Sequence, residues 1–167
     1  LPKGLGHNKK GDIRVNFGKG HTLHGNPIII EAKDDASFFP FNPGNPEKCA
    51  EHYLDKAMEN RECSVGIWIH NKKTSKHFDR DFKVTGNTIF VVWDEDDPGT
   101  DYLLLAALYI AMGRVKIGSD DVDDEERAAI SKLISNLKDE AERYGQMRKF
   151  IDIITTNAKH LDGEITI

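Results

Sequence analysis

Short apolar runs and one alternating run divide the first two thirds of the chain. Residues 12–17 alternate polar and apolar side chains, with Ile13, Val15 and Phe17 on one face, which is typical of a half-buried strand. Residues 28–33, 64–70 and 88–93 are nearly continuous apolar runs, as expected for strands buried on both faces. Glycine, asparagine and proline between residues 18 and 27 predict a loose hairpin connection between the first two strands.

Apolar residues with helical spacing occur between these runs and after the last of them. Residues 46–60 show this spacing after Pro46, which suits a first helical turn. A charged break precedes a second predicted helix at 101–112. A polar linker, in which Asp123 and Glu126 form a capping pair, precedes a third. This order predicts an α/β (α+β) fold: a mixed central sheet flanked by helices, with a long C-terminal helix or helical hairpin.

The last predicted helix carries a heptad-like stripe along residues 125–161. One line repeats every seven residues and consists of Ile130, Leu137, Tyr144, Ile151 and Ala158. A second, less regular line consists of Leu133, Met147, Ile154 and Leu161. Such a stripe indicates a coiled coil or a hairpin, and Gly145 could bend or divide it. We predict two parts, an α/β domain at 1–117 and a helical extension at 118–167, and a homodimer formed through residues 125–161.

Composition narrows the class of protein. The chain has 167 residues, of which 38% are hydrophobic and 31% charged, enough for a buried core. No apolar run reaches the length of a membrane span and no signal peptide is visible, so we expect no membrane partner. Cys49 and Cys63 are too few for a disulfide framework, which favours a reduced, cytoplasmic protein. Because the chain begins at Leu1 without methionine, we expect a processed or excised fragment.

Charge is distributed unevenly along the chain. Residues 1–92 hold 14 Lys/Arg and 11 Asp/Glu, whereas residues 93–167 hold 9 and 17, and the net charge of the whole is -5. Basic residues are densest between positions 70 and 83, where the candidates for phosphate contact are Lys72, Lys73, Lys76 and Arg80. Such a loop could follow a nucleic-acid backbone. An ordinary solvated loop is an equally good interpretation, because acidic residues dilute the charge.

The candidate chemistry lies at the end of the second predicted strand. Alternate strand residues share a face, so Glu31 and Lys33 project together, and Asp12 at the start of the preceding strand can add a second carboxylate. Two carboxylates and an ammonium group can hold Mg²⁺ (or Mn²⁺) and steady an attacking water. The alternative is a surface ion pair of little energetic value. A similar triplet, Asp81-Phe82-Lys83, precedes a glycine turn and is set aside.

The order of these elements resembles the PD-(D/E)XK nuclease superfamily over residues 11–93, with Gly11 where proline is usual. The resemblance implies a restriction-endonuclease-like core in residues 1–117, with Asp12, Glu31 and Lys33 as catalytic residues. It implies Mg²⁺ or Mn²⁺ held by Asp12, Glu31 and the backbone carbonyl of Ala32. Lys33 would then orient the water or stabilise the charged phosphorane. The implied activity is metal-dependent hydrolysis of nucleic-acid phosphodiesters, with DNA endonuclease as the expected form.

Two other interpretations remain beside the nuclease. A catalytically silent module that keeps the nuclease fold and dimerises would account for the acidic average and the long helix. It would also account for the short segment before Asp12, where superfamily members usually have a helix. A zinc site is less favoured, because its four candidate ligands lack a tight turn around either pair: His21, His24, Cys49 and His52.

Overall fold

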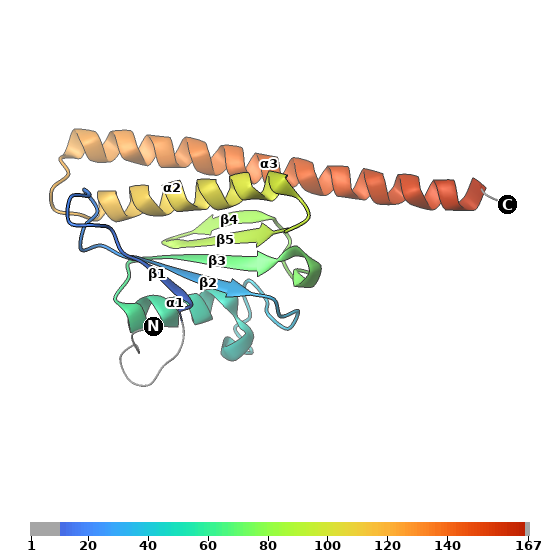
Figure 1. Ribbon diagram of the computed structural model, residues 1–167, viewed down its shortest axis with the longest axis horizontal. Helices are drawn as coiled ribbons and strands as arrows, with labels where there is room; N and C mark the ends of the chain where they lie inside the picture. Colours follow the sequence, from blue (N-terminus) through green and yellow to red (C-terminus); the bar gives the residue numbers. More distant parts are fainter. Residues whose placement is uncertain (1–10, 166–167) are drawn as a thin grey trace.

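A five-stranded mixed sheet forms the centre of the computed structural model, which describes residues 11–165 and the side chains of residues 11–159 (Figure 1). The strand order is β1-β2-β3-β5-β4. The three central strands are parallel: β2 (Ile28–Lys33), β3 (Val65–Asn71) and β5 (Thr88–Trp93). The edge strands β1 (Ile13–Val15) and β4 (Phe82–Thr85) run antiparallel to their neighbours. Residues 1–10 and the side chain of Leu161, which belong to the predictions above, lie outside the described part.

Helices cover both faces of this sheet (Figure 1). The helix α1 (Ala50–Arg61), preceded by the short turn η2 (Pro46–Lys48), covers one face, and α2 (Asp101–Ile117) and α3 (Asp124–Ile165) cover the other. Central strands therefore need apolar side chains on both sides. Ile28, Ile67 and Val91 pack toward α2, whereas Ile29, Trp68 and Phe90 pack toward α1. The predicted mixed sheet with flanking helices and a long C-terminal helix is confirmed.

The edge strands depart most from the prediction. The first strand has only three residues instead of six, and Ile13 on this edge strand is exposed. Phe82 and Lys83, from the triplet that the sequence analysis set aside, begin β4, which forms a hairpin with β5 through Gly86 and Asn87. Gly86 has φ +55°, a conformation that favours glycine. The pattern at residues 82–85 was too short and too polar to be recognised as a strand.

The second helix is also longer than predicted. It continues past Gly113 to Ile117, five residues beyond the expected end. A Cβ atom at Gly113 would lie 2.8 Å from the side chain of Ile134 in α3. Glycine at this position therefore allows α2 and α3 to approach closely, and it does not end the helix.

The last helix is continuous over 42 residues and is not divided at Gly145. Its first half packs on the core of its own chain through Ile134, Leu137, Ala141 and Tyr144. Its second half runs past the start of α2 and away from the sheet (Figure 1). The large side chains there are 55–67% exposed: Met147, Phe150, Ile151, Ile153 and Ile154. The carboxylate of Asp123 accepts the backbone N–H of Glu126 at 2.8 Å, so the Asp123 half of the predicted capping pair is confirmed.

Two expectations about function classes can be compared with this fold. None of the helices within residues 11–165 has both the length and the apolar character needed to cross a membrane. Among the described side chains, those of residues 11–159, no three His, Cys, Asp or Glu are grouped so that they could hold a metal ion. The less favoured zinc site therefore gains no support, and both cysteines are buried free thiols.

Candidate functional site

Glu31 and Lys33 lie near the carboxyl end of β2, on the face covered by α1. Their neighbours in β3 are Trp68 and His70. The Glu31 side chain is fully buried, and that of Lys33 is 20% exposed. The Lys33 Nζ donates to Glu31 Oε1, so the two residues form an ion pair within the fold.

Asp12 completes this cluster from the position just before β1. Its Oδ2 accepts the backbone N–H of Ala32 at 3.0 Å and lies 3.6 Å from Lys33 Nζ. One ammonium group therefore contacts both carboxylates. The Asp12 side chain is 45% exposed, so the cluster meets solvent on the Asp12 side. The three residues that the sequence analysis selected are brought together.

Two backbone groups, which the sequence analysis missed, fix the Glu31 carboxylate. Its Oε2 accepts the N–H of Gly11 at 2.7 Å and the N–H of Asp12 at 3.1 Å. Gly11 has φ +97°, and a Cβ atom there would lie 2.9 Å from Ile29 Cδ1. Proline could not adopt this conformation and has no N–H to donate. Glycine at position 11 is therefore required by this arrangement.

Tyr53 of α1 closes the cluster on the helix side. The Lys33 Nζ lies 5.0 Å from the centre of the Tyr53 ring, within the range of a cation–π contact. Burial, together with the negative charge of Glu31, raises the pKa of Tyr53, so its hydroxyl remains protonated at neutral pH. Burial alone would lower the pKa of Lys33, but its hydrogen bond to Glu31 and the two carboxylate charges raise it. Lys33 is therefore a cation at neutral pH.

This donor set is compatible with a hard divalent ion. Glu31 Oε1 and Asp12 Oδ2 both face the Lys33 ammonium, so a cation position already exists between them. Carboxylate oxygens are preferred ligands of Mg²⁺, which usually keeps several waters. Within residues 11–159, whose side chains are described, no third acidic, His or Cys side chain joins the pair. An ion there would need water, substrate or backbone oxygens as its remaining ligands, and Lys33 would have to turn aside.

The predicted basic loop begins at the same end of the sheet. The turn η3 (Lys72–Thr74) directly follows β3, and the Thr74 hydroxyl donates to Asp34 at 3.1 Å. Lys73 pairs with Glu95 and Asp96 at 2.6 and 3.1 Å, and these contacts raise its pKa. Arg80 lies 3.7 Å from Glu142, and Lys76 is exposed.

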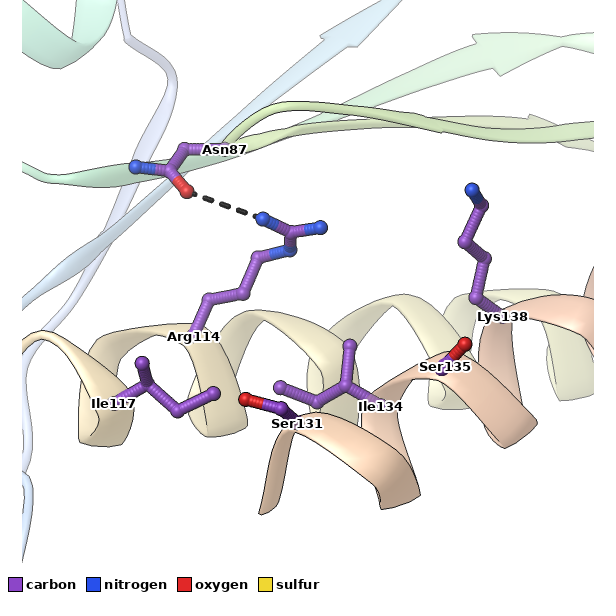
Figure 2. Close-up of a pocket in the computed structure, with 7 residues that line it drawn as sticks. All are labelled: Asn87, Arg114, Ile117, Ser131, Ile134, Ser135 and Lys138. Atoms are coloured by element: carbon purple, nitrogen blue, oxygen red, sulfur yellow. Dashed lines mark hydrogen bonds between the residues drawn. The ribbon is translucent and has the colours of Figure 1, made fainter. Parts of the chain in front are cut away.

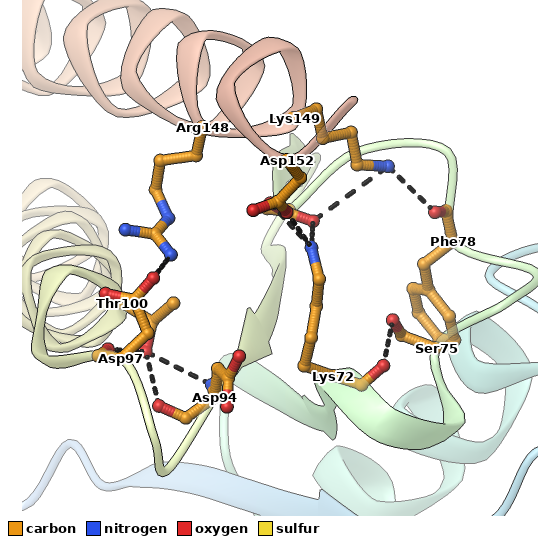
Figure 3. A network of polar contacts seen from close by, with 10 residues as sticks. Lys72, Ser75, Phe78, Asp94, Asp97, Thr100, Arg148, Lys149 and Asp152 are labelled. Atoms are coloured by element: carbon orange, nitrogen blue, oxygen red, sulfur yellow. Dashed lines mark hydrogen bonds and ion pairs between the residues drawn. The ribbon is translucent and has the colours of Figure 1, made fainter. Parts of the chain in front are cut away.

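Lys72, the fourth predicted phosphate contact, belongs to a network that anchors α3 (Figure 3). Its Nζ lies 3.4 Å from the buried Asp81 and 3.2 Å from Asp152 of α3. Lys149 also reaches Asp81, at 3.9 Å, and donates to the carbonyl of Phe78 at 3.1 Å. Lys72, Lys73 and Arg80 thus already have acidic partners, and Asp81 has a structural contact with two lysines.

The buried His70 gives this region a pH-dependent stability. The indole N–H of Trp68 donates to His70 Nδ1 at 3.4 Å, so the neutral ring carries its proton at Nε2, 3.2 Å from the carbonyl of Thr74. Burial lowers the pKa of His70 below 6.5 and outweighs the Thr74 hydrogen bond and nearby carboxylates. Below pH 6.5 the unfolded chain therefore binds a proton on this residue more readily than the folded chain.

We expect the free energy of unfolding to fall as the pH decreases from 7.5 to 5.5. A His70→Phe variant should show a smaller fall, since phenylalanine takes up no proton. Urea denaturation at the two pH values measures both slopes. His24→Gln, at an exposed histidine, is the control and should keep the wild-type slope. A wild-type slope in His70→Phe would assign the pH dependence to other groups.

Comparison with known proteins gives no indication of the function of this chain. No family model matches the chain, and no curated protein or solved structure matches it.

Proposed function

We propose that this chain is a metal-dependent nuclease that hydrolyses phosphodiester bonds, with Asp12, Glu31 and Lys33 as its catalytic residues. One observation carries the proposal: the Lys33 ammonium contacts the carboxylates of both Asp12 and Glu31 at the end of β2. A simple surface ion pair would not need a fully buried glutamate held by two backbone N–H groups. The resemblance of residues 11–93 to the PD-(D/E)XK superfamily agrees with this choice.

Each of the three residues has a role in such a reaction. When bound, Mg²⁺ or Mn²⁺ would activate a water and neutralise charge on the phosphate. Glu31, Asp12 and the Ala32 carbonyl would hold the ion, and the backbone contacts of Glu31 keep its carboxylate fixed. Lys33 would place positive charge where the transition state gains negative charge. Tyr53 of α1 lies beside the Lys33 ammonium and would help to position it.

The substrate that we propose is nucleic acid, with DNA as the form to test first. The carboxyl ends of parallel strands share one edge of a sheet, so the turn after β3 lies beside Lys33. Lys73, Lys76 and Arg80 are exposed there. Backbone phosphates could replace the surface acidic partners of Lys73 and Arg80, because exposed ion pairs are weak. Lys72 is less suited to this role, since its partner Asp81 is buried.

Plasmid nicking in the presence of Mg²⁺ or Mn²⁺ tests the activity. We expect the wild type to nick and Lys33→Ala to be at least about 100-fold slower, as for loss of one charge-stabilising group. Lys83→Ala is the matched control, because Lys83 closes the similar triplet on β4 and contacts neither Asp12 nor Glu31. No wild-type cleavage with either metal, or equal cleavage by Lys33→Ala, would contradict the proposal.

Binding of the metal itself is a second readout of the same proposal. An ion that binds only the folded chain raises the melting temperature, so Mg²⁺ should stabilise the wild type. Asp12→Asn should abolish that rise. If neither cleavage nor this linkage is found, the silent interaction module becomes the better interpretation. Its support is that Glu31 is already satisfied by Lys33 and two backbone N–H groups.

We also propose that the chain forms a homodimer through the second half of α3. The stripe that packs on α2 as Leu137, Ala141 and Tyr144 continues beyond the start of α2 as Ile151 and Ile154, which are exposed. The interface predicted at residues 125–161 is thereby narrowed, because the first half of α3 is already packed within its own chain. A second copy offers an identical stripe, and two-fold pairing is the commonest solution for such surfaces.

A further inference from the structure

A polar pocket of about 380 Å³ lies between α2, α3 and the turn that joins β4 to β5 (Figure 2). Arg114 and Ile117 of α2, Ile134 and Lys138 of α3, and Asn87 of the turn line it. Two serine hydroxyls from α3 complete the lining, at Ser131 and Ser135. The pocket is far from Lys33: Asn87 precedes the first residue of β5, whereas Lys33 is level with the end of the sheet. It also lies on the opposite face, under α2 and α3.

The positive charge of the partly buried Arg114 is poorly compensated by its neighbours. Its Nη1 donates to Asn87 Oδ1 at 3.3 Å, a neutral acceptor. Its Nε is buried and has no hydrogen-bond partner among the described residues. Burial lowers the pKa of Arg114 from its ordinary value, with no carboxylate to offset it. A buried charge without a counter-charge is costly, so this guanidinium favours an anion beside it.

The rest of the lining suits the same anion. Lys138 is half-exposed, and its Nζ is 3.9 Å from Glu142, at the limit of an ion pair. Figure 2 shows Arg114 and Lys138 extending from neighbouring helices to the same side, with Ser131 and Ser135 on α3 below them. Among the described residues, no carboxylate lines the pocket. Two cations and two hydroxyls are donors that phosphate oxygens accept, and charge-assisted hydrogen bonds of this kind are the strong ones.

We propose that this pocket binds the phosphate group of a small molecule, at a site separate from the proposed nuclease centre. The volume lies within the usual range of small-ligand pockets. The acidic first turn of the same helix, with Asp124, Glu125 and Glu126, disfavours an extended polyanion along α3. Occupancy would tie the β4–β5 turn to both helices, since Asn87, Arg114 and Lys138 come from three different elements.

NMR titration of the full chain tests this site. Inorganic phosphate and adenosine monophosphate are the two probes, and an oligonucleotide without terminal phosphates is the third. We expect saturable shifts of the backbone amides of Asn87, Ser131 and Ser135 with the first two. Arg114→Met should weaken binding at least tenfold, as for loss of a charged hydrogen bond. Lys138→Met, at a more exposed position that does not endanger folding, should weaken it several-fold.

Lys132→Met is the matched control, because it removes the same charge from the same helix outside the pocket. Its affinity should equal that of the wild type. Shifts that do not saturate, or that persist unchanged in both Arg114→Met and Lys138→Met, would overturn the site. A stronger response to the oligonucleotide than to adenosine monophosphate would overturn the small-molecule assignment. Nicking activity is not a readout here, so failure of this proposal and failure of the nuclease proposal are distinguishable.

Discussion

Replacement of Glu31 by alanine is expected to remove about 3–5 kcal/mol from the free energy of unfolding, as for one partner of a buried ion pair. The change leaves Asp12, at 3.6 Å, as the carboxylate beside the mostly buried ammonium of Lys33, and leaves the N–H groups of Gly11 and Asp12 without their acceptor. For a chain of this size the melting temperature should fall by roughly 6–20 °C. Urea denaturation measures the change directly.

Two further variants separate the structural role of Glu31 from its proposed catalytic role. Glu31→Gln keeps the side-chain shape and one acceptor for the backbone N–H groups, so it should lose clearly less stability while still losing nicking. Glu59→Ala removes a glutamate of α1 whose side chain is 73% exposed and pairs with Lys56. Surface ion pairs of this kind contribute about 0–1 kcal/mol to stability. If Glu31→Ala were no more destabilising than Glu59→Ala, the cluster would not be part of the fold.

The central strands were predictable because burial on both faces leaves a strong signal. The bounds of β2 and β5 agree with the predicted runs at 28–33 and 88–93, and β3 differs by one residue at each end. Edge strands lack this signal, since one side of each has no neighbour. The strand β4 was therefore missed, and Asp81 just before it, part of the triplet that was set aside, is a buried partner of Lys72 and Lys149.

The site was only partly predictable for a similar reason. Side-chain alternation in a strand places Glu31 and Lys33 on one face, and the neighbouring strand brings Asp12 near. The N–H groups that fix Glu31 come from the main chain at Gly11 and Asp12. Sequence patterns carry no information on where a backbone N–H points. The helical spacing of apolar residues places Tyr53 on the inner face of its helix. Its contact with Lys33, however, depends on how α1 lies over β2.

The exposed half of α3 gives the second large expected effect. Beyond Asp152, which pairs with Lys72, residues 153–165 add 13 helical residues, about 20 Å at 1.5 Å per residue. Helices of this size are marginal when they stand alone in water. Their apolar stripe therefore favours a partner, and antiparallel pairing of two copies would bury Ile151 and Ile154 of each against the other.

We therefore expect light scattering to give twice the chain mass of 18.8 kDa, and Ile151→Asp with Ile154→Asp to give the monomer. Four large apolar side chains leave the dimer interface in this variant, each worth about 1.5–3 kcal/mol. The loss corresponds to a weakening of at least about 10⁴-fold. Thr156→Asp with Asn157→Asp adds the same charge away from the stripe and should remain dimeric. A wild-type monomer at tens of micromolar would refute the dimer. The fold should survive in every variant, because the first half of α3 is held by its own core through Leu137, Ala141 and Tyr144.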